Sequence, residues 1–545
     1  MSVKDFYLMI APSTTVLTGL TPYAGPWTFE EAAHLLRRAT FGPTRERIKW
    51  SVAQGLEATI DKLFEELPLP VPPVNAFYTN DPAVGVGEPW INAPYTDVTP
   101  QASYRFRSLT SWTIGLMWEE GIHIREKLTL FWHNHFPVNA VEDPKFLYRY
   151  IHTMRSHAWG NFRDLTKAIT IDPAMLRFLN GNQNKKEAPN ENYARELLEL
   201  FTVGKGPQAG PGDYTNYNEQ DVQQIARILS GWRDYGLTVE SVNGDFGSYF
   251  TPDRHDDGVK NLSFHFNNEV ITNMGDQEYK HLIDIIFEQD EVARFISRKL
   301  YRWFVFHEIT PEAETEVIQP MAQILIDHDY EIKPALMALL SSEHFYETQF
   351  RGLIVKNPID HLLSIAKTFE IDISTPTDKR YDSWYRFWGF AQVMQMGYYE
   401  VPEVAGWQAY YREPLYYRNW LNSATLPRRM SYSEGLANNG FFPFQANGEL
   451  MRVDVLKFLA TLDTPEDPNA IVDQCVQLLF PKPLSTERKD ALKAILLPGL
   501  PDFEWTVEYL DYAADPGNSQ FSNPIDAKLR SLIKAMVTMP DFFLS

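Results

Sequence analysis

Two histidines stand two positions apart in the segment Phe131-Trp-His-Asn-His-Phe136. The imidazole ring is a common metal ligand, and it is a general acid or base near neutral pH. On a regular helix His133 and His135 point about 200° apart, so both could reach one ion only if the helix ends there. Pro137 disfavours helix at the residue before it, which would allow this. The alternative is that one ring caps helical carbonyls while the other packs beside Trp132.

A stripe of polar side chains follows at helical spacing between Asn190 and Gly204. Asn192, Glu196 and Glu199 lie at i, i+4 and i+7 and therefore share one face of a helix. Two glutamates one turn apart can bridge a metal ion, or they can act as acid and base when their pKa values differ. A solvated helix face would show the same stripe, although the leucines around it leave little of the helix exposed.

A third group of titratable residues lies in the loop His255-Asp-Asp-Gly258. His255 and Asp256 could hold a divalent cation, although a polar turn has the same composition. Arg195 and Arg227 are suited to binding a carboxylate through two parallel hydrogen bonds, or to orienting an anionic substrate.

These clusters support a first hypothesis, an enzyme of unassigned reaction that depends on one divalent metal ion. It would be a hydrolase or an oxidoreductase, because the ligand types do not decide between the two. The metal ligands would be His135, Glu196, His255 and Asp256. The catalytic groups would be Glu196, Glu199, His133, Arg195 and Arg227. Asp172 and Asn190 would support these groups by hydrogen bonds.

Two further hypotheses stand beside the first. Aromatic residues make up 14% of the chain, including 14 Trp and 27 Tyr, and such rings stack well on sugars. A metal-free carbohydrate-active hydrolase or lyase would then use Glu and His as acid and base. The other hypothesis is a non-catalytic helical scaffold or binding protein, in which the polar stripes are buried networks. A cleft onto which the polar groups converge would favour either enzyme. The expected ligand is a small molecule or a polysaccharide.

The composition is that of a folded, acidic protein. The chain has 545 residues, of which 44% are hydrophobic and 22% charged, and its formal net charge is -21. An acidic excess of this size argues against a nucleic-acid groove. The single cysteine, Cys475, excludes an intrachain disulfide. We see neither a signal peptide nor an apolar run long enough to span a membrane, which predicts a cytoplasmic protein.

Helical periodicity dominates, and it predicts a mainly α, multi-helical globular fold. Thr28 and Glu31 form a capping-box pattern at the start of one helix. Few short strands are expected, near residues 237–242 and 248–251. The Pro-rich stretch 67–100 predicts a long surface loop. We expect residues 1–370 to form an N-terminal body that carries the polar clusters, and residues 371–545 to form a smaller helical part packed on it.

Several segments resemble the bacterial family called domain of unknown function 1800, and the resemblance covers nearly the whole chain. The segments are Ala32–Thr44, Phe131–Phe136, Asp172–Leu176, Asn190–Thr202, Ala226–Trp232, His255-Asp256 with Lys260, Pro402–Trp407, Trp420–Ala424 and Met539–Leu544. The resemblance implies no particular reaction, because none is established for the family. It implies that relatives are often exported and encoded beside a sulfatase-like partner, whereas no export signal is seen in this chain.

Overall fold

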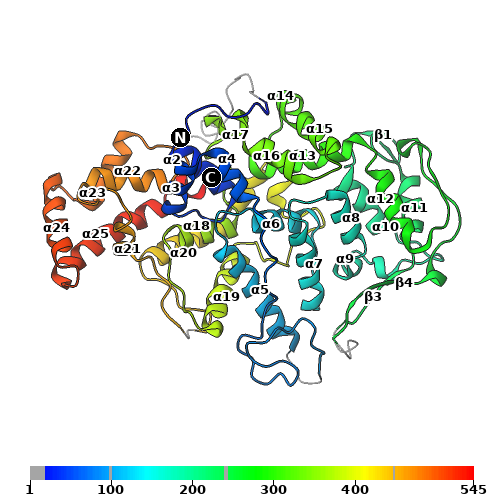
Figure 1. Cartoon of the computed structure of the whole chain (residues 1–545), viewed down its shortest axis with the longest axis horizontal. Coiled ribbons are helices and arrows are strands. Elements are labelled where there is room, and N and C mark those ends of the chain that lie inside the picture. Colours follow the sequence, from blue (N-terminus) through cyan, green and yellow to red (C-terminus); the bar gives the residue numbers. More distant parts are fainter. Residues whose placement is uncertain (1–18, 97–100, 238–243, 446–447) are drawn as a thin grey trace.

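The computed structural model describes residues 19–96, 101–237, 244–445 and 448–545, and helices dominate it (Figure 1). The prediction of a mainly α fold with few short strands is confirmed. The helices up to residue 304 are α2 (Phe29–Ala39), α3 (Arg45–Gln54), α4 (Leu56–Leu63), α5 (Gln101–Glu119), α6 (Arg125–His135), α7 (Pro144–Ser156), α8 (Phe162–Thr170), α9 (Pro173–Phe178), α10 (Glu191–Glu196), α11 (Glu219–Ile228), α12 (Glu278–Ile286) and α13 (Asp290–Phe304). Those after residue 304 are α14 (Pro311–Ala313), α15 (Gln319–Asp327), α16 (Ile332–Leu340), α17 (Glu343–Tyr346), α18 (Pro358–Thr368), α19 (Thr377–Val393), α20 (Thr425–Ala437), α21 (Val455–Leu459), α22 (Pro468–Leu479), α23 (Thr486–Leu496), α24 (Asp502–Ala514) and α25 (Ser519–Val537).

The strands of the described residues form three separate two-stranded antiparallel sheets. The strands are β1 (Gln208–Gly210), β2 (Asp213–Tyr214), β3 (Trp232–Tyr235), β4 (Gly247–Phe250), β5 (Lys260–Asn261) and β6 (Val270–Ile271). The strand predicted at 248–251 corresponds to β4, whereas most of the one predicted at 237–242 lies outside the described residues. Residues 67–96 contain neither a helix nor a named strand, as the predicted loop requires.

The capping box predicted at the start of α2 is present. The side chain of Thr28 accepts a hydrogen bond from the backbone of the first turn, and Glu31 accepts one from the backbone N–H of Thr28. The end of the chain returns to this region, where the backbone N–H of Lys356 donates to the carbonyl of Phe543 at 2.8 Å. Figure 1 accordingly places the C-terminus beside α2 and α4.

Helix α6 lies near the centre of the molecule, and all of its residues are buried (Figure 1). Its polar side chains must therefore find partners inside the protein. Glu126, for example, accepts two hydrogen bonds from Arg155, at 2.7 and 2.8 Å. The segment with the two histidines is thus part of the core.

Contacts cross the predicted division between residues 370 and 371. Helix α19 packs along α5, and Arg107 forms an ion pair with Asp382. The division into residues 1–370 and 371–545 stays a prediction. Among the described residues, no helix combines the length and the apolar character that a membrane span needs.

Candidate functional site

His133 has both of its ring nitrogens engaged inside the core. Its Nε2 accepts a hydrogen bond from the backbone N–H of Tyr399 at 3.1 Å. The ring proton is therefore on Nδ1, which lies 2.9 Å from the hydroxyl of Tyr150. That hydroxyl in turn donates to the carbonyl of Phe136. Burial lowers the pKa of His133 to about 3, so the ring is neutral and positions Tyr399.

Asn134, the next residue of α6, holds the same distant segment at a second point. Its Oδ1 accepts a hydrogen bond from the backbone N–H of Trp407 at 2.9 Å. The preceding residue, Gly406, has φ +95°, and a Cβ there would lie 2.5 Å from Asn134 Oδ1. Glycine is therefore required where the two backbones approach. His133 and Asn134 together fix the chain between Tyr399 and Trp407.

This fixed segment forms part of the wall of a cavity of about 520 Å³. The volume lies within the range of small-molecule sites. The cavity lies between the end of α19 and the start of α20, and two 3₁₀ turns, Gln408–Tyr410 and Tyr416–Trp420, contribute to its wall. Its polar and aromatic lining residues are Gln392, Gln395, Glu400, Trp407, Gln408, Arg418, Asn419, Trp420 and Asn422.

Three donors in this lining have no partner among the residues that the structure describes. They are the indole Nε1 of Trp407, the indole Nε1 of Trp420 and the Nδ2 of Asn419. The two tryptophans are only 2% and 4% exposed. Buried indole N–H groups normally have an acceptor, and the described residues supply none for these three buried donors.

His135 points to a different place, the turn that follows α10. Its Nε2 lies 3.0 Å from the carbonyl of Phe201, and its Nδ1 lies 3.1 Å from Lys299 Nζ. Burial lowers the pKa of His135 well below its usual value and that of Lys299 to about 7. Phe201 belongs to a π-helical turn, Leu197–Thr202. His135 therefore anchors this turn through its backbone.

Glu196 and Glu199 have unequal surroundings. Burial and the charge of Glu199 raise the pKa of Glu196, and the described residues offer its carboxylate no hydrogen-bond donor. Glu199 accepts a hydrogen bond from the hydroxyl of Tyr217 at 3.0 Å. Arg195 binds Glu219 through two hydrogen bonds of 2.7 Å. Figure 1 places α10 at the right end of the molecule, away from α19 and α20.

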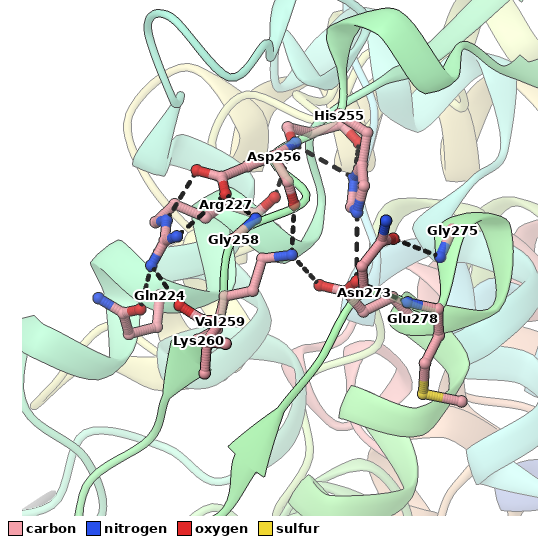
Figure 2. A network of polar contacts seen from close by, with 12 residues as sticks. Gln224, Arg227, His255, Asp256, Gly258, Val259, Lys260, Asn273, Gly275 and Glu278 are labelled. Carbon is pink, nitrogen blue, oxygen red and sulfur yellow. Dashed lines mark hydrogen bonds and ion pairs between the residues drawn. The ribbon is translucent and has the colours of Figure 1, made fainter.

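His255 belongs to a buried polar network (Figure 2). Its Nδ1 lies 2.9 Å from the carbonyl of Ser230, and its Nε2 lies 3.2 Å from Glu278 Oε2. Lys260 Nζ lies 2.5 Å from the other carboxylate oxygen, Glu278 Oε1. His255, Lys260 and Glu278 form a compact buried ion cluster.

Asp256 and Arg227 extend this network to one side (Figure 2). The Arg227 guanidinium donates to both carboxylate oxygens of Asp256, at 2.8 and 2.9 Å. The pairing holds the pKa of Asp256 below its usual value. The acid that completes the cluster, Glu278, was not among the residues predicted from the sequence. It stands 23 positions from His255, in a different element.

The four predicted metal ligands do not converge. Among the residues that the structure describes, no group of three or more His, Cys, Asp or Glu side chains could hold a metal ion. His135 anchors the turn after α10, and Asp256 is bound by Arg227. Glu196 lies near Glu199, and His255 near Glu278. The described geometry thus does not fit one divalent ion on this set.

Asp172 and Asn190 cap helices. The Asn190 side chain accepts a hydrogen bond from the backbone at the start of α10. Asp172 Oδ1 accepts one from the backbone N–H of Ala174 at 2.9 Å, at the start of α9. Burial raises the pKa of the Asp172 carboxyl from 3.8 to about 7.

Replacing Asp172 by asparagine should therefore change how stability depends on pH. With its folded-state pKa raised, Asp172 is protonated in the folded protein and ionised in the unfolded chain between about pH 4 and 7. Its stabilising contribution is complete at low pH, and it is lost as the pH rises through 7. Between about pH 4 and 7, this group should lower the free energy of unfolding of the wild type by on the order of 4 kcal/mol. Asp172→Asn keeps a capping side chain that does not titrate, so this part of the fall should be absent in the variant. Urea unfolding at several pH values measures this. Parallel pH curves for the two proteins would contradict it.

The family model described as "Protein of unknown function (DUF1800)" matches residues 34–544. The chain belongs to this family. Neither a curated protein nor a solved structure shows a significant match to it.

The cavity residues were not predicted as a site from the sequence. Two of the segments that resemble the DUF1800 family, Pro402–Trp407 and Trp420–Ala424, contribute to its wall. They contain few titratable side chains, and a search for acid–base groups and metal ligands passes over amides and indoles. The signal that could have found them is the grouping of Asn, Gln and Trp in this part of the chain.

Proposed function

We propose that this protein binds a neutral saccharide in the cavity between α19 and α20. The single observation that carries the proposal is a cavity of about 520 Å³ lined mainly by side-chain amides and by two tryptophans. The proposal belongs to the carbohydrate class that the aromatic content of the sequence suggests, at a different place from Glu196 and Glu199.

The chemistry of the lining supports a polyhydroxylated ligand. Asn and Gln amides each present a donor and an acceptor in one plane, which suits the neighbouring hydroxyl groups of a sugar. Some are already oriented: Asn422 Nδ2 donates to Gln395 Oε1 at 3.0 Å, and Gln392 donates to Glu400 at 2.9 Å. Such contacts fix the amide planes before a ligand arrives, which lowers the entropic cost of binding.

The charge of the lining supports a neutral ligand. Glu400 and Arg418 are its charged side chains and have opposite signs. An anionic or cationic ligand would gain little net attraction there. A purely apolar ligand would displace water from the Asn and Gln amides of the lining without replacing its hydrogen bonds, which costs free energy.

Calorimetric titration with neutral saccharides tests the proposal. We use glucose, N-acetylglucosamine, maltotriose, cellotriose and chitotriose as probes. At least one should bind, and Trp420→Phe, which removes only the indole N–H and some ring area, should weaken that binding roughly tenfold. Asn419→Ala should do the same. Trp27→Phe is the matched control, since that indole donates to the carbonyl of Ser51 outside the cavity.

Two results would contradict the proposal. One is that no probe binds at millimolar concentration. The other is that Trp420→Phe and Trp27→Phe bind a probe equally well. An enzyme that uses Glu196 and Glu199 stays a prediction, and the same probes assayed for cleavage test it, because Glu196→Gln would then abolish cleavage without weakening binding. A sulfatase-like partner also stays a prediction of the family resemblance.

A further inference from the structure

A second region has unused donors of another kind, where α2, α18 and the end of the chain meet. Two neighbouring cavities of about 20 Å³ each share Arg37, Asp360 and Ser545 in their linings. Each has room for about one guest of the size of a water molecule. They are distinct from the proposed saccharide cavity, with which they share no lining residue.

Positive charge exceeds negative charge around these cavities. The lining contains four cations, namely Arg37, Arg38, Lys127 and Lys356. The one carboxylate side chain in the lining is that of Asp360, and its two oxygens already receive Lys127 Nζ and, at 2.8 Å, the amide of Asn357. Arg37, Arg38 and Lys127 alone outnumber this carboxylate.

Arg38 differs from the other three cations because it has buried donors without a partner among the described residues. It is 5% exposed and lines one of the cavities. Its Nη2 donates to the carbonyl of Phe350 at 2.9 Å, but its Nε and Nη1 are buried without a partner among the described residues. A guanidinium held in the interior without an anion is costly, because it loses its hydration and gains no counter-charge.

Arg429 is a second buried guanidinium with unpartnered nitrogens. It is fully buried, and none of its three guanidinium nitrogens has a partner in the described part of the chain. The charges of Arg37 and Arg429 add to burial in lowering the pKa of Lys356, which falls to about 7. Arg429 is thus close enough to act on the cavity electrostatically. A water molecule would satisfy some of these donors, but it would leave the excess charge uncompensated.

We propose that the cavity lined by Arg38, Lys127 and Asp360 holds one small inorganic anion, attracted by the Arg38 guanidinium beside the pair formed by Lys127 and Asp360. The size of the cavities favours chloride, a single atom not much larger than a water molecule, over phosphate or sulfate. The anion would supply the counter-charge that Asp360 provides only in part. It would tie α2 to α18 and so stabilise the contact between the two ends of the chain.

Thermal unfolding of the full chain tests the site. The protein is prepared in sodium gluconate, and chloride replaces gluconate at constant ionic strength. The melting temperature should rise with the logarithm of the chloride concentration once this exceeds the dissociation constant, by roughly 2–4 °C over the series, as expected for an ion that binds only the folded state. Arg38→Met should remove this rise. Arg294→Met, which changes an arginine on the outer face of α13, should retain it.

A crystal grown with bromide provides a second measurement that does not depend on the folding of a variant. Anomalous scattering should place a bromide ion beside Arg38. Equal melting temperatures in gluconate and chloride, together with no bromide at this position, would mean that water fills the cavities and would overturn the proposal. Stabilisation by sulfate or phosphate but not by chloride would overturn the assignment of the anion. Neither result depends on whether saccharides bind.

Discussion

Replacing Glu278 by alanine is expected to lower the free energy of unfolding by about 3–5 kcal/mol. Glu278 is fully buried and is the common partner of His255 and Lys260. Burial alone would raise the pKa of Glu278, but hydrogen bonds from His255 and Lys260 hold it below its usual value. Its removal would leave the buried Lys260 ammonium without a counter-charge. Urea unfolding followed by circular dichroism measures the loss.

Glu288→Ala is the matched control for this variant. Glu288 follows α12 by two residues, is exposed and forms no ion pair with the described residues, so its replacement should change stability by less than about 0.5 kcal/mol. A similar small effect of Glu278→Ala would show that the cluster in Figure 2 contributes little to the fold. Glu278→Gln, which keeps the shape and removes the charge, separates the electrostatic part of the loss from the packing part.

Replacing Gly406 by alanine is expected to disrupt the cavity proposed to bind a saccharide. At φ +95° any other residue is strained, and the new Cβ would lie 2.5 Å from Asn134 Oδ1 and 2.6 Å from the Asn134 carbonyl oxygen. The strain and the overlap together should cost about 2–5 kcal/mol. Because the adjacent Trp407 contributes to the wall, saccharide affinity should fall at least tenfold in a calorimetric titration.

Gly389→Ala is the matched control for the glycine. Gly389 lies within α19, and a Cβ there would meet nothing within 4 Å. Alanine should therefore be neutral, or stabilise the helix by up to about 1 kcal/mol, and saccharide affinity should be unchanged. If Gly406→Ala behaved like Gly389→Ala, the contact between Asn134 and the 406–407 backbone would have no role in shaping the cavity.

The sequence predicts the mainly α fold and the start of α2, because helical periodicity and capping depend on neighbours a few positions away. The capping box of Thr28 and Glu31 is an example. It also identifies the segment of His133 and His135 as unusual, since polar residues there interrupt an apolar helix. What the sequence does not show is the partner of each ring. The backbone N–H that donates a hydrogen bond to His133 belongs to Tyr399, 266 positions away.

The same limit explains why the predicted metal ligands do not meet. Donor types and spacing can be recognised along the chain, but convergence depends on how distant helices pack. Lys299, which lies beside His135, and Glu278, which completes the His255 cluster, come from other elements. The cavity residues were missed for a chemical reason as well, because amides and indoles carry no charge and do not titrate near neutral pH. Their proposed role follows only from their common position around an open volume.

Fluorine NMR of protein labelled with 5-fluorotryptophan tests the central claim most directly. The chain has 14 tryptophans, and the signals of Trp407 and Trp420 are assigned by the loss of one peak in Trp407→Phe and in Trp420→Phe. Addition of a saccharide that binds in calorimetry should shift these two signals and leave that of Trp27 unchanged. A saccharide that binds while both cavity signals stay in place would contradict the assignment of the cavity as the saccharide site.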